Sequence, residues 1–303
     1  MKDLRCVSKT EQKKFFDSFD QVLCDVDGVL WHFPEKIPGA DLGLAYLKNL
    51  KKQIIFVSNK TTKSQNEVYK NLKSFGFDLN QQDLIMPQLA VIWYLEKINF
   101  NKKIFLLGMT SLKVELEDAG FEIVKSEPGV IPESVSKFFD FSLVDDCNIG
   151  AVVCDTDVNL NYLQLQKAGT YLKRSDTLFI TTNGSRNLYS GTERVLFGPG
   201  YFDEILENFT GRKALRLAKP SLQYNEFIKE KFQLRNTSRV LFIGDSIEDD
   251  MAFASNCGYK KLLVLSGNTH KNQLLNWKFP DKSGMDYYVD SLKVVHDILS
   301  AIY

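Results

Sequence analysis

The sequence predicts an α/β protein built on a parallel β-sheet, with a second α/β domain inserted into the first. Short apolar runs that suit buried strands alternate with segments of helical periodicity, which is the pattern of strand–helix–strand units. After two helical segments the alternation starts again at Ile104–Gly108, and we place the inserted domain from there. The predicted limits are 1–100 and 213–303 for the core and 101–212 for the insertion.

Four apolar runs predict the core strands, and helical segments separate them. The runs are Val22–Cys24, Ile54–Val57, Val240–Ile243 and Leu262–Leu265. The first helix is expected over 8–19, because Ser8 precedes Glu11 at the spacing of a capping box. Further helices are expected near 41–50, 65–75 and 89–98. Pro220 opens another helix, whose apolar positions include Leu222, Phe227 and Ile228.

The inserted domain is predicted to contain further parallel strands. These are assigned to 104–108, 149–155 and 178–183, with a helix near 162–172. Residues 184–200 are rich in glycine and polar groups, so we expect a loop or an irregular hairpin there rather than a packed element. Loops of that length are usually either functional or disordered.

Composition argues against several classes of protein. The chain has 303 residues, 44% of them apolar and 25% charged, and its 38 lysines and arginines equal its 38 aspartates and glutamates. This balance gives no sign of a nucleic-acid or membrane partner. The five cysteines form no CxxC pair, and the polar segment Met1–Asp20 lacks the apolar region of a signal peptide. We therefore expect reduced thiols and a soluble, cytoplasmic protein.

Two aspartates, Asp25 and Asp27, follow the first core strand. Gly28 allows a tight turn that can swing both carboxylates toward one point beyond the strand end. Such a pair can divide the work of catalysis, with one carboxylate as nucleophile and the other as acid and base. The alternative is that both are turn formers, since Asp-Gly is a common turn sequence.

Polar residues also mark the ends of other core elements. They are Ser58 after the second strand, Lys219 before its helix, and Asp245 and Asp250 after the third strand. Ligands of an open parallel sheet bind outside the carboxyl ends of the strands, so we expect these residues to converge with Asp25. Taken singly, each has a structural explanation: a helix start for Lys219-Pro220, a cap or turn for Ser58-Asn59, and a favourable helix dipole for Asp250.

The converging carboxylates would need positive charge. They are Asp25, Asp27, Asp245 and Asp250, with Glu248 and Asp249 close by. These groups would repel one another strongly, and one lysine does not offset them. A hard divalent cation with oxygen ligands does, and Mg²⁺ is expected because it accepts one or two carboxylates together with a phosphate oxygen.

Together these motifs resemble the four motifs of the haloacid dehalogenase (HAD) superfamily of phosphatases. The matching elements are Asp25-Val26-Asp27-Gly28-Val29, the strand-end Ser58, Lys219-Pro220 before a helix, and Gly244-Asp245 with Asp250. The domain-sized insertion between Ser58 and Lys219 is similar to the branch that carries an α/β C2-type cap on a Rossmann-like core. The chain is most similar to the 4-nitrophenylphosphatase, phosphoglycolate phosphatase and pyridoxal phosphatase group. That likeness rests on Asp27–Trp31, Ser58-Asn59, Thr62–Ser64, Asn256–Gly258 and Leu263–Gly267.

The resemblance implies a role for each matching residue. Asp25 would attack phosphorus and form an aspartyl phosphate, and Asp27 would protonate the leaving alkoxide and later deprotonate the attacking water. The implied metal-binding set is Asp25, the main-chain carbonyl of Asp27, Asp245 and Asp250, the last of which would orient a metal-bound water. The implied substrate-binding set is Ser58, Asn59, Lys60 and Lys219. Of these, Ser58 and Lys219 also count as catalytic, because they would stabilise the charge of the transition state.

Some residues depart from the pattern of the group. Its cap is expected to carry Thr-Asn-x-Asp and Pro-Gly-x-Gly elements, whereas this chain has Thr182–Arg186 and Phe197–Gly200 at those places. Arg186 and Arg194 either bind a second anionic group of the substrate or are simply solvated. Lys60 stands in place of an asparagine, and it either strengthens anion binding or points to solvent.

The predicted function is hydrolysis of a small phosphorylated metabolite by a Mg²⁺-dependent phosphatase. A cap that closes over the site excludes water and proteins, which favours a small substrate. One alternative is a catalytically quiet relative that binds a phosphorylated ligand or a protein, and another is a phosphomutase or phosphotransferase. The resemblance also makes a homodimer formed through the cap an expectation to test.

Overall fold

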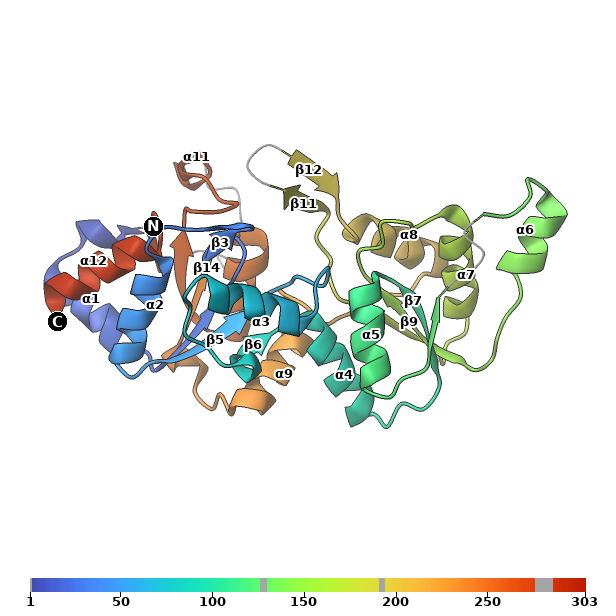
Figure 1. Ribbon diagram of the computed structural model, residues 1–303, viewed down its shortest axis with the longest axis horizontal. Helices are drawn as coiled ribbons and strands as arrows, with labels where there is room; N and C mark the ends of the chain where they lie inside the picture. Colours follow the sequence, from blue (N-terminus) through green and yellow to red (C-terminus); the bar gives the residue numbers. More distant parts are fainter. Residues whose placement is uncertain (1, 126–129, 191–193, 276–285) are drawn as a thin grey trace. The chain divides into compact units, whose positions relative to one another are not determined.

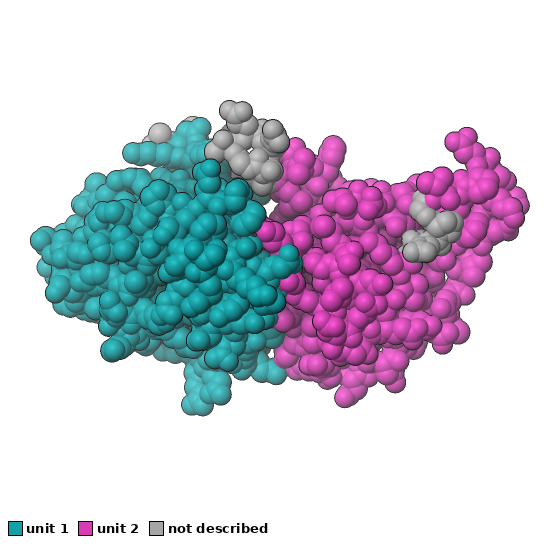
Figure 2. Space-filling view, viewed as in Figure 1, with its two compact units in different colours: residues 1–58, 65–85, 219–303 teal, residues 59–64, 86–218 magenta. Residues whose placement is uncertain are grey.

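The computed structural model describes residues 2–125, 130–190, 194–275 and 286–303. Contacts between residues group the chain into two compact units (Figure 2). Unit 1 comprises Met1–Ser58, Gln65–Ile85 and Lys219–Tyr303, and unit 2 comprises Asn59–Ser64 and Met86–Ala218. The limits of 101 and 212 for the inserted domain stay a prediction.

Unit 1 is built on a seven-stranded sheet whose neighbouring strands are all parallel. The strand order is β1-β16-β15-β14-β2-β5-β6. The strands are β1 (Lys2–Asp3), β2 (Gln21–Cys24), β5 (Gln53–Val57), β6 (Leu84–Ile85), β14 (Val240–Gly244), β15 (Lys260–Val264) and β16 (Tyr287–Val289). A small antiparallel hairpin, β3 (Trp31–His32) with β4 (Glu35–Lys36), lies outside this sheet.

The register of the central strands brings distant chain segments to one edge of the sheet. The end of β2 is in register with its two neighbours, β5 and β14. Because the three strands run in the same direction, the residues that follow them leave the sheet at the same edge. Those residues are Asp25 after β2, Ser58 after β5 and Asp245 after β14.

Helices and short turns complete unit 1. The helices are α1 (Lys9–Asp17), α2 (Ala40–Asn49), α3 (Gln65–Ser74), α9 (Leu222–Phe232), α10 (Ala252–Cys257), α11 (Lys271–Leu275) and α12 (Leu292–Ile302). The turns are the 3-10 segments η1 (Leu4–Cys6), η2 (Gln81–Asp83) and η3 (Thr237–Arg239) and the π-helical η4 (Ile247–Met251). In Figure 1, α1, α2 and α12 lie together, and α12 contacts both of the others.

Two helix starts test the sequence interpretation. The Ser8 side chain caps α1 as predicted, because its hydroxyl oxygen accepts the N–H of Glu11 at 3.2 Å. In α9, Phe227 and Ile228 are buried, but Leu222 is 51% exposed. The predicted helix is present, and the exposure of Leu222 follows from its spacing, which places it on the side opposite Phe227 and Ile228 in a helix with 3.6 residues per turn.

Unit 2 contains a second parallel sheet, in the order β13-β10-β9-β7-β8. The strands are β7 (Lys103–Leu107), β8 (Ile123–Lys125), β9 (Ile149–Cys154), β10 (Leu178–Thr181) and β13 (Leu215–Arg216). Every residue of β9 is buried, as expected for an inner strand of a sheet covered on both faces. The predicted fold class, an α/β protein with a second α/β unit, is confirmed.

The helices of unit 2 pack against its sheet or against one another. They are α4 (Pro87–Lys97), α5 (Thr110–Asp118), α6 (Val135–Ser142), α7 (Tyr162–Leu172) and α8 (Gly200–Thr210). Tyr171 of α7 and Leu206 of α8 share one apolar cluster with Phe105 of β7. The rings of Phe105 and Tyr171 meet edge to face, with centroids 5.1 Å apart. Across the described ranges of both units, helices lack the combination of length and apolarity that a membrane span requires.

Residues 184–200 are more regular than the loop or irregular hairpin that we predicted. They contain an antiparallel pair, β11 (Asn187–Ser190) with β12 (Arg194–Phe197), and α8 begins at Gly200. Pairs such as Leu188 with Leu196 form the ladder. Glycine and polar residues weaken a strand pattern in the sequence, whereas pairing within the hairpin satisfies the backbone regardless of side-chain type.

Candidate active site

The candidate site begins with Asp25, directly after β2. Its backbone N–H donates to the carbonyl oxygen of Ile243 in β14 at 2.9 Å, so the sheet fixes its position. The Asp25 side chain is buried. The following turn requires glycine at position 28, where φ is +80° and a Cβ would stand 2.3 Å from Asp245 Oδ2. The turn after β2 and the Asp245 carboxylate therefore pack closely together.

Lys219 lies between two of the carboxylates. Its Nζ donates to Asp25 Oδ1 at 2.6 Å and to Asp250 Oδ1 at 2.7 Å. It also donates to the carbonyl oxygen of Val57 at 3.2 Å, which ties it to the last residue before Ser58. The Lys219 side chain is 3% exposed, so these charge-assisted hydrogen bonds are shielded from water.

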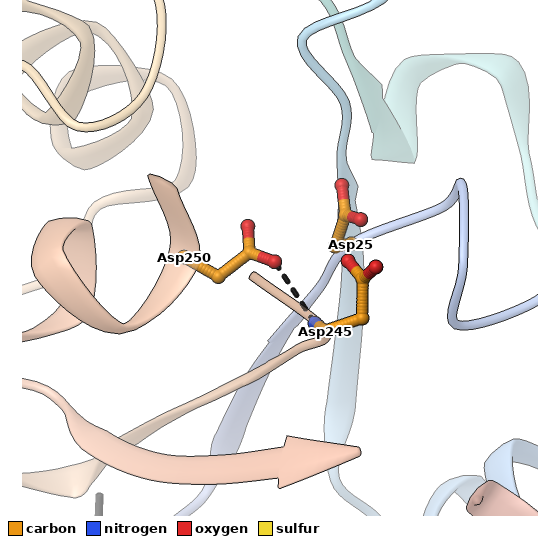
Figure 3. Close-up of side chains that lie close together, drawn as sticks. All are labelled: Asp25, Asp245 and Asp250. Atoms are coloured by element: carbon orange, nitrogen blue, oxygen red, sulfur yellow. Dashed lines mark hydrogen bonds between the residues drawn. The ribbon is translucent and has the colours of Figure 1, made fainter. Parts of the chain in front are cut away.

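The loop after β14 presents the remaining carboxylates (Figure 3). Asp250, in η4, accepts the backbone N–H groups of Asp245 and Ser246 at Oδ2, each at 3.0 Å. Asp245 Oδ2 accepts the N–H of Asn268 at 2.6 Å. A Cβ at Gly244 would stand 2.3 Å from Asp250 Oδ2, so only glycine permits this approach. Backbone groups therefore help to aim both carboxylates.

Asp25, Asp245 and Asp250 form what we call the carboxylate cluster. One oxygen atom from each of the three lies within 4.8 Å of the other two. All three residues are buried; Asp25 and Asp245 follow neighbouring strands, and Asp250 stands on the helical turn η4 (Figure 3). Carboxylate oxygens are the ligands that Mg²⁺ prefers. The donor set of the cluster therefore fits a hard divalent cation.

Burial and like charges govern the pKa values of the cluster. Burial raises the pKa of Asp25 to about 7, with Lys219 opposing the rise and Asp250 adding to it. Burial, followed by repulsion from Asp25 and Asp250, also raises the pKa of Asp245 well above its usual value. Burial by itself lowers the pKa of Lys219, but the two carboxylates raise it on balance. Lys219 is thus a permanent cation beside carboxylates whose burial and mutual repulsion disfavour their being ionised all at once.

Asp27 is held by the indole of Trp31. Trp31 Nε1 donates to Asp27 Oδ1 at 2.9 Å, and Trp31 is 1% exposed. The indole ring meets Phe33 and Phe75 edge to face, with centroids 5.6 and 5.8 Å away. A donor in a packed, buried ring has few alternative orientations, so it directs the Asp27 carboxylate. The sequence did not indicate this contact.

Ser58 and the next two residues follow β5. Ser58 is buried, its N–H donates to the carbonyl oxygen of Ile85 at 2.9 Å, and its carbonyl oxygen accepts the Tyr224 hydroxyl at 3.2 Å. Asn59 and Lys60 group with unit 2, whereas the other predicted site residues belong to unit 1. Unit 1 by itself thus assembles the carboxylate cluster with Lys219, and it ties Ser58 to that cluster through the neighbouring Val57 carbonyl.

Arg186 and Arg194 are the two arginines that we considered as substrate ligands. Arg186 Nε donates to Glu204 Oε1 at 2.6 Å, on the exposed side of α8. The side chain of Arg194 lies outside the described residues. The ion pair occupies part of the Arg186 guanidinium, so a role in binding the substrate stays a prediction.

Two buried aspartates of unit 2 were not predicted as functional candidates. Asp155, directly after β9, accepts a hydrogen bond from the Thr61 hydroxyl at 2.7 Å. Asp203 of α8 accepts one from the Thr181 hydroxyl at 2.6 Å. Burial raises the pKa of Asp155 to about 6 and that of Asp203 to about 7. The available signal for Asp155 was its place at the end of an apolar run, the same signal that identified Asp25.

Family models match two segments of the chain, and known proteins match nearly all of it. Residues 22–122 match the family model described as haloacid dehalogenase-like hydrolase, and residues 216–295 match the one described as HAD-hydrolase-like. Phosphoglycolate phosphatase 2 of Arabidopsis thaliana is 31% identical over 302 residues, which cover 97% of this chain and 98% of that protein. The 4-nitrophenylphosphatase of Schizosaccharomyces pombe is 31% identical over 291 residues, covering 94% and 96%.

A solved structure gives the same result. The p-nitrophenyl phosphatase from Archaeoglobus fulgidus is 26% identical, with a TM-score of 0.77, and the match covers 94% of this chain and 99% of that one. The first family-model match spans Asp25, and the second spans Lys219 and Asp245. The chain therefore belongs to the haloacid dehalogenase-like hydrolase family, in its group of phosphatases with a C2-type cap.

Proposed function

We propose that this protein is a Mg²⁺-dependent phosphatase that hydrolyses a small phosphomonoester through an aspartyl phosphate. One observation carries the proposal most directly. Lys219 Nζ lies within hydrogen-bond distance of both Asp25 and Asp250, in a buried carboxylate cluster at the carboxyl ends of parallel strands. A protein that only binds a ligand needs no such nucleophile and cation, so the contact favours catalysis over the quiet alternative.

In the first step the Asp25 carboxylate attacks the phosphorus atom of the substrate. The bond from phosphorus to the alkoxide breaks as the bond from phosphorus to Asp25 forms, and Asp27 gives a proton to the departing oxygen. The hydrogen bond from Trp31 to Asp27 Oδ1 orients the carboxyl group that gives this proton. The first product is an alcohol.

In the second step water releases the phosphate. Asp27, now ionised, takes a proton from a water molecule whose oxygen attacks the phosphorus of the aspartyl phosphate. The bond from phosphorus to Asp25 breaks, and free phosphate and the Asp25 carboxylate result. Lys219 remains charged throughout and offsets the negative charge that spreads over the phosphoryl oxygens.

Metal and phosphate ligands complete the proposal. Asp25, Asp245, Asp250 and the main-chain carbonyl of Asp27 would hold Mg²⁺. When bound, Mg²⁺ supplies positive charge that reduces repulsion between the carboxylates and the phosphate. Ser58, Asn59, Lys60 and Lys219 would hold the phosphoryl oxygens. The names of the relatives, phosphoglycolate phosphatase and 4-nitrophenylphosphatase, support small esters as the substrate class.

The decisive experiment measures release of inorganic phosphate from 4-nitrophenyl phosphate in the presence of Mg²⁺. Asp25→Asn removes the nucleophile with little change in shape, so we expect a loss of about 10⁴-fold or more in kcat. Asp140→Asn, which changes an exposed aspartate of α6 paired with nearby Lys137, is the matched control and should keep full activity. Wild-type protein without activity, or Asp25→Asn with activity, would contradict the mechanism.

The same assay separates hydrolysis from phosphoryl transfer. A hydrolase releases one phosphate for each 4-nitrophenol, whereas a phosphotransferase supplied with alcohols or sugars releases more 4-nitrophenol than phosphate. We expect equal amounts. Screening phosphoglycolate, pyridoxal phosphate and other phosphorylated metabolites by kcat/KM then identifies the preferred ester. A homodimer through the cap is part of the proposal too, and light scattering of the purified protein measures it.

A further inference from the structure

The sheet of unit 2 has its own point where a ligand would ordinarily bind. From β7 the chain proceeds to β8 on one side, and then returns to β9, β10 and β13 on the other. Ligands of open α/β sheets bind at such a switch point, outside the carboxyl ends of the strands. Asp155 stands there, directly after β9, and its N–H donates to the carbonyl oxygen of Leu107 at the end of β7, at 2.8 Å.

A segment of the chain itself occupies this point. Thr61 Oγ1 donates to Asp155 Oδ1 at 2.7 Å, and the two residues are 1% and 2% exposed. Ser111, near the start of α5, donates its hydroxyl to the carbonyl oxygen of Thr61 at 2.9 Å. Gln88 of α4, also buried, donates to the carbonyl oxygen of Lys63 at 3.4 Å. Side chain and backbone of the short segment Asn59–Ser64 are therefore both held.

The segment Asn59–Ser64 starts with two of the proposed phosphate ligands. Asn59 and Lys60 follow Ser58 directly and precede Thr61 by two positions and one position. Within unit 2, the hydrogen bonds of Thr61 to Asp155 and Ser111 hold the segment of which Asn59 and Lys60 are the first two residues, and this limits the backbone freedom of that segment. We propose that Asp155 is a positioning residue for phosphate binding, which acts by holding Thr61 and thereby Asn59 and Lys60. The inference rests on the proposed function, in which Asn59 and Lys60 contact the phosphate.

The cost of burying Asp155 supports a role beyond packing. A buried carboxylate is expensive unless it is well bonded, and burial raises the pKa of Asp155 to about 6 while the hydrogen bond from Thr61 opposes the rise. An apolar residue would fill the same space without that cost. What Asp155 adds is a set of directed hydrogen bonds, of which the one from Thr61 reaches the segment Asn59–Ser64.

Unit 2 supplies a matched control pair. Thr181 Oγ1 donates to Asp203 Oδ2 at 2.6 Å, and these residues are 1% and 3% exposed. The chemistry and the burial match those of the Thr61–Asp155 pair. The Thr181–Asp203 pair joins β10 to α8 and does not involve the segment Asn59–Ser64. Loss of either hydrogen bond should lower stability, whereas only loss of the Thr61 bond should weaken phosphate binding.

The test measures two constants with Mg²⁺ present: the Kd of inorganic phosphate by titration calorimetry and, with 4-nitrophenyl phosphate as substrate, the KM. Thr61→Val removes the hydroxyl at constant shape. We expect the Kd and the KM to rise about tenfold, which corresponds to a loss of about 1.4 kcal/mol in binding free energy. The kcat should fall less than about threefold. Thr61→Ser keeps the donor and should restore the Kd to within about twofold. Thr181→Val should leave the Kd and the KM unchanged, although it lowers the melting temperature.

Single and double variants of Thr61 and Asp155, compared by their phosphate affinity, test whether Asp155 acts through Thr61. Asp155→Asn keeps an oxygen that accepts the Thr61 hydrogen bond and should retain phosphate affinity, whereas Asp155→Val should lose it. The double variant Thr61→Val with Asp155→Val should bind phosphate no more weakly than either single variant. Additive losses would overturn the proposal, as would equal effects of Thr61→Val and Thr181→Val. Where valine at position 61 prevents folding, Thr61→Ala removes the hydroxyl without adding a second methyl group.

The two proposals fail in different ways. Wild-type protein that binds phosphate but releases none from any ester overturns the proposed hydrolysis, and the Kd series still tests Asp155. Wild-type protein that hydrolyses 4-nitrophenyl phosphate, together with a Thr61→Val variant of unchanged Kd and KM, overturns only the role of Asp155.

Discussion

The two parallel sheets of this protein both end in buried aspartates, but the two sets of aspartates have different hydrogen-bond partners. In unit 1 the carboxylate cluster faces the ammonium group of Lys219 and backbone N–H groups. In unit 2, Asp155 and Asp203 face the hydroxyls of threonines. Burial raises the pKa of the aspartates in both units, but in unit 1 the ammonium group of Lys219 opposes that rise, whereas for Asp155 in unit 2 neutral hydrogen-bond donors do so. The same place in the same kind of sheet can therefore serve chemistry or architecture.

The largest effect is expected from a substitution that removes the positive charge of Lys219 from the carboxylate cluster. Lys219→Met leaves Asp25 and Asp250 buried without their cation. We expect a loss of about 3–5 kcal/mol in the free energy of unfolding, as for other buried pairs deprived of one partner, together with loss of phosphatase activity. Urea denaturation and the 4-nitrophenyl phosphate assay measure these. Lys229→Met, which removes an exposed partner of Glu226, should change stability by less than about 1 kcal/mol.

The second prediction concerns the pH dependence of unit 2. The pKa of Asp203 is about 7 in the folded protein and 3.8 in its ordinary state, so between these values the folded protein binds the extra proton. Protonation of Asp203 therefore stabilises the folded state. This contribution to the free energy of unfolding is complete below about pH 4 and is lost as the pH rises toward 7, by an amount on the order of 4 kcal/mol. Asp203→Asn cannot ionise and should flatten this slope. Urea midpoints at pH 5 and pH 8 compare the two proteins, and equal slopes would contradict the assignment.

A third prediction distinguishes the carboxylate cluster of unit 1 from the buried aspartates of unit 2 by their response to Mg²⁺. Mg²⁺ at about 100 times its Kd should stabilise the wild-type protein by about 2.7 kcal/mol, seen as a higher melting temperature. Asp245→Asn removes one ligand and one of the repelling charges, so it should abolish the Mg²⁺ shift without lowering the stability of the metal-free protein. Asp155→Asn in unit 2 should retain the full shift. A shift that persists in Asp245→Asn would place the metal elsewhere.

The smallest expected effect tests the hydrogen bond from Trp31 to Asp27. Trp31→Phe keeps an aromatic ring and removes the indole N–H, which is worth about 1 kcal/mol. We expect kcat to fall about fivefold for alkyl phosphates, whose leaving oxygen needs a proton, and less for 4-nitrophenyl phosphate, whose leaving group needs it less. Trp93→Phe is the matched control. A loss that is the same for both kinds of ester would mean that Trp31 acts on folding rather than on Asp27.

Much of the site could be predicted because its residues stand at strand ends. Asp25, Asp245 and Lys219 each adjoin an apolar run or a helix start, and neighbouring parallel strands bring such residues together whatever their separation in the chain. Contacts made by side chains across the fold were not predictable in this way. The Trp31 indole on Asp27 depends on how one ring packs among its neighbours, and no periodicity in the sequence records it.

The sequence by itself determined the α/β class, the family motifs and the residues that we propose for the reaction, since hydrophobic periodicity and short motifs are local properties of the chain. Only the tertiary structure decided which charges meet. It placed Lys219 between Asp25 and Asp250, and it gave Thr61 rather than a cation to Asp155. Burial and hydrogen-bond partners set the state of a carboxylate, and both arise only when distant segments pack together.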